Sequence, residues 1–222
     1  MSLSVDSLKT VAQTALSEKN NTRRNFIQSV QILIKLREVD ISKPENRFSL
    51  LVELPNVNEK MRKSVCVLTE GSLLTQARSL GVDVLSRADL EPLAGNKKMA
   101  RRLARKYDFF ISEAPLMPLV GRIMGQFLAP RDKMPTPVPP NSDISSNVLR
   151  LTRSVQVRLK VQKAISVVIG KEDMPVEQLA ENASRVISAV EEKLTGGKRN
   201  IDYVALKTAI GRKVKLEEGK HG

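Results

Sequence analysis

Hydrophobic and polar residues alternate at a spacing of two in several stretches near the two ends of the chain. The clearest stretches cover residues 30–37, 48–54 and 155–162. Successive side chains of a β-strand point to opposite faces of the sheet, so each stretch predicts a strand buried on one face. Polar residues 42–47 connect the first two strands, and the second strand of a hairpin is expected around residues 165–169, after the third stretch.

Two other stretches near the chain ends repeat their hydrophobic residues at helical spacing. The first begins behind Ser4, a residue that favours helix N-termini, and ends near Asn20. The second has Pro175 near its start and Gly196 past its end, as helices often do. Its apolar stripe comprises Val176, Leu179, Ala180, Ala183, Val186, Ile187, Val190 and Leu194. The last strands are expected at residues 203–210 and 213–216.

In the middle of the chain, short apolar stretches alternate with helical ones, a pattern typical of a parallel sheet built from βαβ units. The strands are expected at residues 65–68, 82–85 and 108–111, and the helices at 72–80, 96–107 and 119–128. Residues 129–140 contain five prolines. Because proline lacks the backbone N–H that regular structure uses, this segment is expected to be irregular.

These patterns predict an α/β protein of two domains. Residues 1–65 and 150–222 together form a discontinuous α+β sandwich domain, and residues 66–149 form an inserted Rossmann-like βαβ domain. The chain would cross between the domains twice at one place. Two adjacent crossings make a natural hinge.

The composition indicates a polyanionic partner. Lys and Arg outnumber Asp and Glu by 37 to 24, giving a net charge of +13 and a pI near 10, which is typical of nucleic-acid-binding proteins. Aromatic residues make up only 3% of the chain, so base stacking is not expected to dominate. A membrane surface would suit the same charge, but the sequence shows neither a long apolar run nor a signal peptide. A cytoplasmic protein without a membrane partner is therefore expected.

The positive charge is unevenly spread along the sequence. Residues 1–65 and 150–222 hold 26 Lys and Arg against 16 Asp and Glu, and therefore +10 of the +13. We expect the discontinuous domain to bind the polyanion for this reason.

Few residues are suited to catalysis or metal binding. Cys66 is the only cysteine and His221, close to the last residue, is the only histidine, which excludes a cysteine-based zinc site and a histidine relay. Gly71 and Ser72 lie between an apolar strand and a helix, where Rossmann-like folds bind phosphate, but the glycine-rich fingerprints are missing. No cofactor is expected, and a nucleotide-dependent enzyme remains the alternative.

Two groups of basic residues are candidates for contacts with phosphate. One face of the third alternating stretch carries Gln156, Arg158, Lys160 and Gln162, which suits a sugar-phosphate backbone as well as it suits a solvated surface. The predicted helix 96–107 carries six basic residues: Lys97, Lys98, Arg101, Arg102, Arg105 and Lys106. They spread over a broad arc, which favours a solvated helix face while leaving phosphate contact open.

Three segments resemble the archaeal type of the ribosomal protein L-one family. Asp40, Pro44 and Arg47, followed by the Leu-Pro-Asn run that ends at Asn56, are similar to the family's first-domain segment. The second domain's signature is matched from residue 109 by FFISEAPLMPLVGR and from residue 128 by LAPRDKMP. The resemblance extends over nearly the whole chain.

The resemblance implies a structural protein, not an enzyme, that binds 23S-type rRNA of the large-subunit stalk in the cytoplasm. It also implies assistance in releasing deacylated tRNA from the exit site, repression of translation of the protein's own mRNA, and a monomeric state when free. RNA contacts are implied at Phe26, Gln28, Ser29, Lys163, Ser166, Gly170, Lys171, Lys207, Thr208 and Gly211. The basic strand face adds Arg158 and Lys160 to this set.

The chain departs from the family pattern at a few of these positions. Gln28 stands where a glutamate is common, and the family usually has glycine at Ala129 and Asp132. The family's Thr-Met-Gly-Pro segment reads Ala-Ile-Gly-Arg here, so that only Gly211 is kept. A glycine at such a place serves either a turn or the close approach of a ligand, and we expect a ligand contact at Gly211.

Overall fold

The computed structural model describes residues 4–22, 24–140 and 142–216. The chain divides into two compact units. Unit 1 contains the residues up to Met61 and from Ser154 onward, and unit 2 contains Arg62–Arg153. The boundaries fall a few residues away from those expected after residues 65 and 149. His221 lies outside the described residues.

Unit 1 contains a four-stranded antiparallel sheet of order β10-β9-β1-β8. Its strands are β1 (Ser29–Leu36), β8 (Ala164–Lys171), β9 (Ile201–Thr208) and β10 (Val214–Lys215). A separate antiparallel pair joins β2 (Phe48–Glu53) to β7 (Ser154–Leu159). The expected hairpin of β7 and β8 is therefore wrong in its pairing, because β7 takes β2 as its hydrogen-bonded partner and β8 takes β1. The periodicity located these strands but could not specify their partners.

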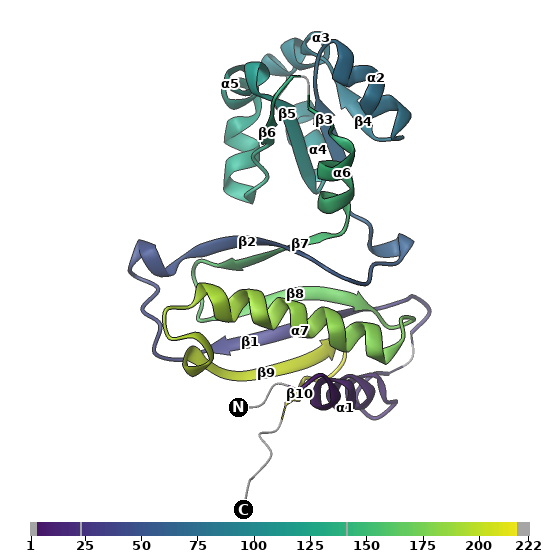
Figure 1. The fold of residues 1–222 in the computed structure, drawn as a ribbon, viewed down its shortest axis with the longest axis vertical. Coiled ribbons are helices and arrows are strands. Elements are labelled where there is room, and N and C mark those ends of the chain that lie inside the picture. Colours follow the sequence, from purple (N-terminus) through teal and green to yellow (C-terminus); the bar gives the residue numbers. More distant parts are fainter. Residues whose placement is uncertain (1–3, 23, 141, 217–222) are drawn as a thin grey trace, which may run out of the picture. The chain divides into compact units, whose positions relative to one another are not determined.

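Two helices, α1 (Val5–Leu16) and α7 (Val176–Lys193), pack on the same side of the four-stranded sheet (Figure 1). Ser4 caps α1 by accepting a hydrogen bond from the Ser7 N–H. Side chains such as Leu8, Ile32 and Leu206 are fully buried between the helices and the sheet. Each such side chain contributes about 1.5–3 kcal/mol through burial, and the opposite face of the sheet remains open to solvent.

Unit 2 has a parallel sheet of order β4-β3-β5-β6, formed by β3 (Val65–Leu68), β4 (Asp83–Leu85), β5 (Phe109–Glu113) and β6 (Thr136–Val138). Strand β6 corrects the expectation that residues 129–140 are wholly irregular. Pro137 is opposite Ser112 within this strand. An edge strand tolerates proline because it needs hydrogen bonds on one side only.

The helices of unit 2 are α2 (Ser72–Ser79), α3 (Arg87–Leu90), α4 (Lys97–Lys106), α5 (Met117–Leu128) and α6 (Ser145–Thr152). Neither α3 nor α6 was predicted, since both are too short for a clear apolar stripe. Short 3-10 turns occupy Pro44–Asn46, Glu59–Met61, Glu91–Ala94, Ala114–Leu116, Ala129–Arg131 and Gly197–Asn200. Asp132, where the family usually has glycine, adopts a left-handed conformation with φ of 54°, which Asp tolerates better than most residues.

The observed boundaries change the distribution of charge. Unit 1 holds 22 Lys and Arg against 16 Asp and Glu, and unit 2 holds 15 against 8. Four basic residues near the crossings, Arg62, Lys63, Arg150 and Arg153, belong to unit 2. The net charges are therefore +6 and +7, so the share of the discontinuous domain falls from +10 to +6 of the +13 when these boundaries are used.

Candidate RNA interface

Three segments that are far apart in sequence meet at one end of the four-stranded sheet. Ser29 begins β1 and is opposite Lys171, near the end of β8. Val30 is opposite Thr208, the last residue of β9. The antiparallel pairing therefore brings together most of the residues that the resemblance implied, and we call this place the Ser29 end of the sheet.

A polar network centred on Asn21 joins these segments. The Oδ1 atom of Asn21 accepts hydrogen bonds from Gln28 Nε2 at 2.7 Å and from Thr208 Oγ1 at 2.9 Å. Its Nδ2 atom donates to Glu172 Oε2 at 2.9 Å. Glu172 also accepts a hydrogen bond from the backbone N–H of Gln28, at 2.9 Å. Both polar atoms of the Asn21 side chain are thereby used to hold β1, β8 and β9 in register.

The same network fixes the loop that follows β9. Gln28 Oε1 accepts from the Ile210 N–H at 3.1 Å, and Thr208 Oγ1 accepts from the Gly211 N–H at 3.0 Å. The carbonyl of Asn20 accepts from the Arg212 N–H at 2.9 Å. Residues 209–212 are therefore held against the segment that follows α1.

The side chains of Gln28 and Thr208 are buried within this network. Gln28 is 1% exposed and Thr208 is fully buried, and the side-chain polar atoms of both are bonded within the network. The network gives both side chains a positioning role, and the direct RNA contacts expected of them stay a prediction. Asn21 and Glu172 were missed because nothing in the local sequence marks them, and Glu172 lies 151 residues from Asn21.

The two glycines of the predicted site are explained by close packing within the protein. A Cβ at Gly170 would collide with Leu179 Cδ2 of α7. A Cβ at Gly211 would collide with Thr208 Oγ1 and would lie 2.7 Å from the Asn20 carbonyl oxygen. The φ angle of Gly211 is not positive. The chain itself therefore makes a close approach at Gly211, and the expected contact with a ligand there stays a prediction.

Exposed side chains surround this network. Phe26 is 54% exposed, Ile27 is 41% exposed and Ile210 is 57% exposed. Lys171 Nζ donates to Ser29 Oγ at 2.9 Å, and this pair is only partly buried. Stacking on an exposed ring and hydrogen bonding by an ammonium group are both common in RNA recognition.

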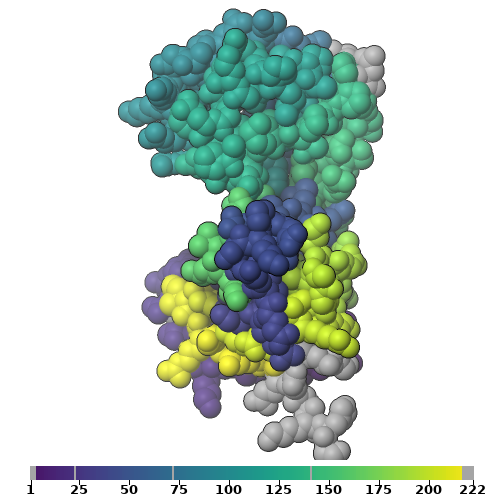
Figure 2. All heavy atoms as spheres, turned by 90° about the vertical axis from the view of Figure 1, so that its left-hand side faces the viewer, coloured from purple at the N-terminus to yellow at the C-terminus, as the bar shows by residue number. Residues whose placement is uncertain are grey.

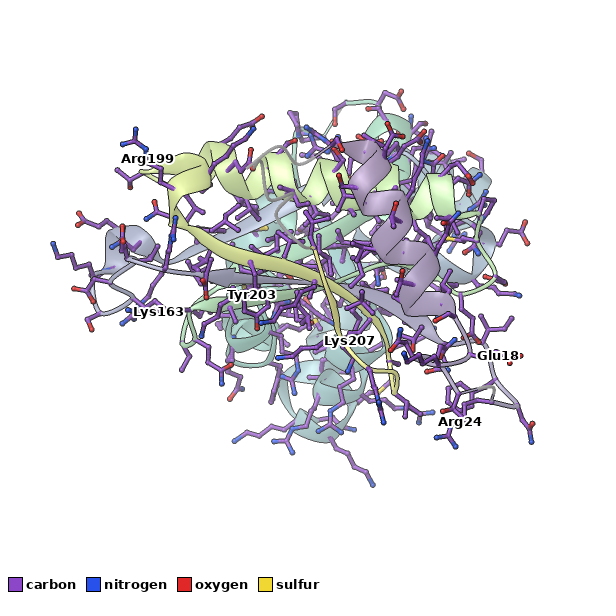
Figure 3. The ribbon with its side chains drawn as sticks, turned by 90° about the horizontal axis from the view of Figure 1, so that it is seen from below. Glu18, Arg24, Lys163, Arg199, Tyr203 and Lys207 are labelled. Atoms are coloured by element: carbon purple, nitrogen blue, oxygen red, sulfur yellow. The ribbon has the colours of Figure 1, made fainter. Side chains whose placement is uncertain are left out.

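Basic residues continue from the Ser29 end across the open face of the sheet. Lys207 alternates with the buried Leu206 and Thr208, so its side chain lies on the face away from α7 (Figure 3). On the same face, Lys215 Nζ lies 4.6 Å and Lys213 Nζ 5.8 Å from the centroid of the Tyr203 ring. Ser166 is exposed in β8, which pairs with β1 on the side opposite to β9.

Arg158, Lys160 and Lys163 lie at the other end of unit 1. The carbonyl of Lys163 accepts a hydrogen bond from the Leu36 N–H, at the end of β1 opposite to Ser29. The eight residues of β1 separate the two ends, a span of roughly 23 Å at about 3.3 Å per residue. Arg158 donates to Gln156 Oε1 within its own strand. The structure thus separates these three residues from the Ser29 end.

Lys163 lies near the carboxyl group of Asp40, an exposed residue in the segment that follows β1. Hydrogen bonds from Ser42, and then the nearby charges of Lys43 and Lys163, lower the pKa of the Asp40 carboxyl group. Figure 2 views this end of unit 1, where the indigo segment around residues 40–47 adjoins the green segment around residue 160.

Comparison with known proteins shows to which family the chain belongs. The sequence model of the Ribosomal protein L1p/L10e family matches residues 16–212. The chain belongs to this family. It is 45% identical over 195 residues to "Large ribosomal subunit protein uL1" of Thermococcus kodakarensis, covering 87% of this chain and 90% of that protein. The protein of the same name from Methanobrevibacter smithii is 40% identical over 201 residues, covering 90% and 94%.

Family membership makes this chain a structural ribosomal protein and not an enzyme. The structure of unit 2 also disfavours nucleotide binding. Rossmann-like folds bind phosphate at the carboxyl ends of the central strands. There the buried Glu113 accepts a hydrogen bond from Thr69 Oγ1. A carboxylate at this position would repel a phosphate group. The helices of the described residues include none that is long and apolar enough to span a membrane.

Proposed function

We propose that the chain is a cytoplasmic protein of the large ribosomal subunit whose unit 1 binds 23S-type stalk rRNA at the Ser29 end of its sheet. The observation that carries this proposal is the convergence of residues 26–29, 170–172 and 207–212 around one hydrogen-bonded network. The relatives are named as large-subunit proteins, which supports the choice of RNA.

The chemistry of this surface suits RNA. Phe26 offers an exposed ring on which a base can stack. Lys171, Lys207 and Lys213 offer ammonium groups to phosphates, and Ser29 and Ser166 offer hydroxyls to phosphates or 2′-hydroxyls. Gln28, Thr208, Gly170 and Gly211 act by holding the backbone in place. Arg158, Lys160 and Lys163 would meet RNA only if it extends along the open face of the sheet.

We further propose that units 1 and 2 are independently folding domains. Removing unit 2, by joining Met61 to Ser154 through a short Gly-Ser linker, is expected to leave a folded protein that keeps most of the affinity for stalk rRNA. The linker is feasible because the Lys63 N–H donates to the Thr152 carbonyl at 2.9 Å, which places the two crossings side by side. The main core of unit 1 contains no residue from 62–153.

Calorimetry and RNA titration of this deletion variant test the assignment. A cooperative melting transition with a Kd within about tenfold of the full chain, or about 1.4 kcal/mol, is the expected result. A folded variant that has lost RNA binding would contradict the placement of the site in unit 1.

Two finer roles are proposed with the rRNA function. Unit 2 would assist release of deacylated tRNA from the exit site, and the Ser29 end would bind an rRNA-like site in the protein's own mRNA and so repress its translation. The free protein would be a monomer. Competition of an own-mRNA fragment with stalk rRNA tests the second role, because two RNAs that use one site must exclude each other.

A further inference from the structure

The helix α4 is the most strongly basic element of unit 2. Six of its ten residues are Lys or Arg, and none is acidic. All six basic side chains are exposed, whereas Ala100 and Ala104 are buried against the core of unit 2. The part of α4 that is not packed is therefore almost entirely cationic.

One row of this surface has a defined geometry. Lys98, Arg102 and Lys106 follow one another at a spacing of four residues, which places them along one side of a helix. Together with Asn96, Met99 and Leu103 they line a shallow depression of about 500 Å³. Met99, in the neighbouring row, is 52% exposed.

The charges of this row are only partly compensated within the protein. Lys106 Nζ lies 2.9 Å from Asp83 Oδ2 and 2.7 Å from the Tyr107 hydroxyl. Within the described residues, Lys98 and Arg102 form no ion pair. Like charges four residues apart destabilise a helix. The row thus costs stability and contributes little to the fold, as expected of a surface that meets an anionic partner.

The composition of the surface favours RNA over an acidic protein. The cores of protein–protein interfaces are depleted of charged residues, whereas interfaces with nucleic acids are strongly positive. Here the exposed apolar area is limited to Met99 and the half-buried Leu103. A few phosphate contacts alone bind weakly at physiological salt, but tethering to an RNA already held elsewhere raises the effective concentration of such a site.

We propose that α4 is a second RNA surface, which binds the sugar-phosphate backbone of a helical segment of the same RNA that unit 1 holds. The inference rests on the proposed rRNA binding by unit 1. Lys98 and Arg102 contact phosphates, and the surface reads no base sequence.

Neutralising the row tests this inference in the full chain. The double variant Lys98→Gln/Arg102→Gln is titrated at several salt concentrations with a long stalk rRNA fragment and with the shortest fragment that retains binding. On the long fragment, the slope of log affinity against log salt is expected to fall by about 1.4–1.8, the contribution of two phosphates at roughly 0.7–0.9 each. On the short fragment the slope is expected to stay unchanged.

A matched control removes two charges elsewhere in unit 2. Arg78 and Arg122 are exposed and lie outside α4, so Arg78→Gln/Arg122→Gln is expected to keep the wild-type slope on both fragments. Met99→Gln is expected to bind RNA like wild type. A partner that packs against the exposed Met99 side chain would instead bind this variant more weakly.

Each alternative outcome has a distinct meaning. An unchanged slope for Lys98→Gln/Arg102→Gln on the long fragment overturns the role of α4 while leaving the proposed function intact. An equal fall of the slope on both fragments, or the same fall in the control variant, would mean that only the net charge of the protein matters. This result also overturns the role of α4. A wild-type chain that binds neither fragment defeats the proposed function, and the inference with it.

Discussion

Replacing Gly211 by valine is expected to lower the stability of the protein and its affinity for stalk rRNA together. The first side-chain carbon would lie 2.7 Å from the carbonyl oxygen of Asn20 and still closer to Thr208 Oγ1. The Asn20 carbonyl cannot move freely, because it accepts the hydrogen bond of the Arg212 N–H. Overpacking of this kind costs about 1–3 kcal/mol, and displacement of residues 209–212 would disturb the RNA surface that they form.

The measurement is thermal unfolding and RNA titration on the same Gly211→Val sample. Gly121 provides a control, since it lies in α5 and a Cβ there has no neighbour within 4 Å. Gly121→Val is expected to have the melting temperature and the RNA affinity of the wild type. A Gly211→Val variant with wild-type stability but weaker binding would restore the view that this glycine touches the RNA directly.

Replacing Asn21 by aspartate is expected to destabilise the whole Ser29 end, although the two side chains have nearly the same shape. The new carboxylate could still accept from Gln28 and Thr208, but it could no longer donate to Glu172 Oε2, which lies 2.9 Å from Asn21 Nδ2. Two carboxylates would then face each other at hydrogen-bonding distance. Leaving a half-buried charged acceptor without its donor costs about 1–3 kcal/mol, and RNA affinity should fall because residues 209–212 are held by the same network.

The pH dependence of this variant gives a second test. Two facing carboxyl groups repel each other when both are ionised, which favours binding of a proton in the folded state. Between about pH 7 and about pH 5 the folded variant is therefore expected to bind more protons than the unfolded chain. Its stability relative to wild type is therefore expected to rise as the pH is lowered from about 7 to about 5. Asn147→Asp adds the same charge in the first turn of α6, where acidic residues are tolerated, and should show no such recovery. A stability deficit that does not change with pH would exclude charge repulsion as its cause.

The elements with strong periodicity were predictable from the sequence. The strands β1, β2 and β7 and the helix α7 lie where the spacing of apolar residues placed them, because each buries one face in the core of unit 1. The short elements α3, α6 and β6 were not predictable. Their position depends on contacts with the rest of unit 2, and the sequence around them shows no clear period of apolar residues.

The candidate site was predictable in location but not in the role of its side chains. Family resemblance pointed to residues 26–29 and 207–211, and strand pairing does bring them together. Nothing in the sequence indicated that Gln28 and Thr208 are buried, because their partner Asn21 lies in an unremarkable polar segment. The alternation over residues 155–162 predicted a strand, which β7 confirms only as far as Leu159. Lys160 lies beyond the strand, and Val161, expected on its buried face, is 86% exposed. The alternation also could not show that Arg158 and Lys160 lie far from the Ser29 end.

Amide hydrogen exchange of the full chain, free and bound to stalk rRNA, tests the central claim most directly. RNA at the Ser29 end should slow exchange in residues 26–29, 170–172 and 207–212, since these segments form the proposed contact surface. Residues 159–163, at the far end of the sheet, should exchange as in the free protein. Slower exchange confined to residues 159–163, with no change in the three segments of the Ser29 end, would contradict the account.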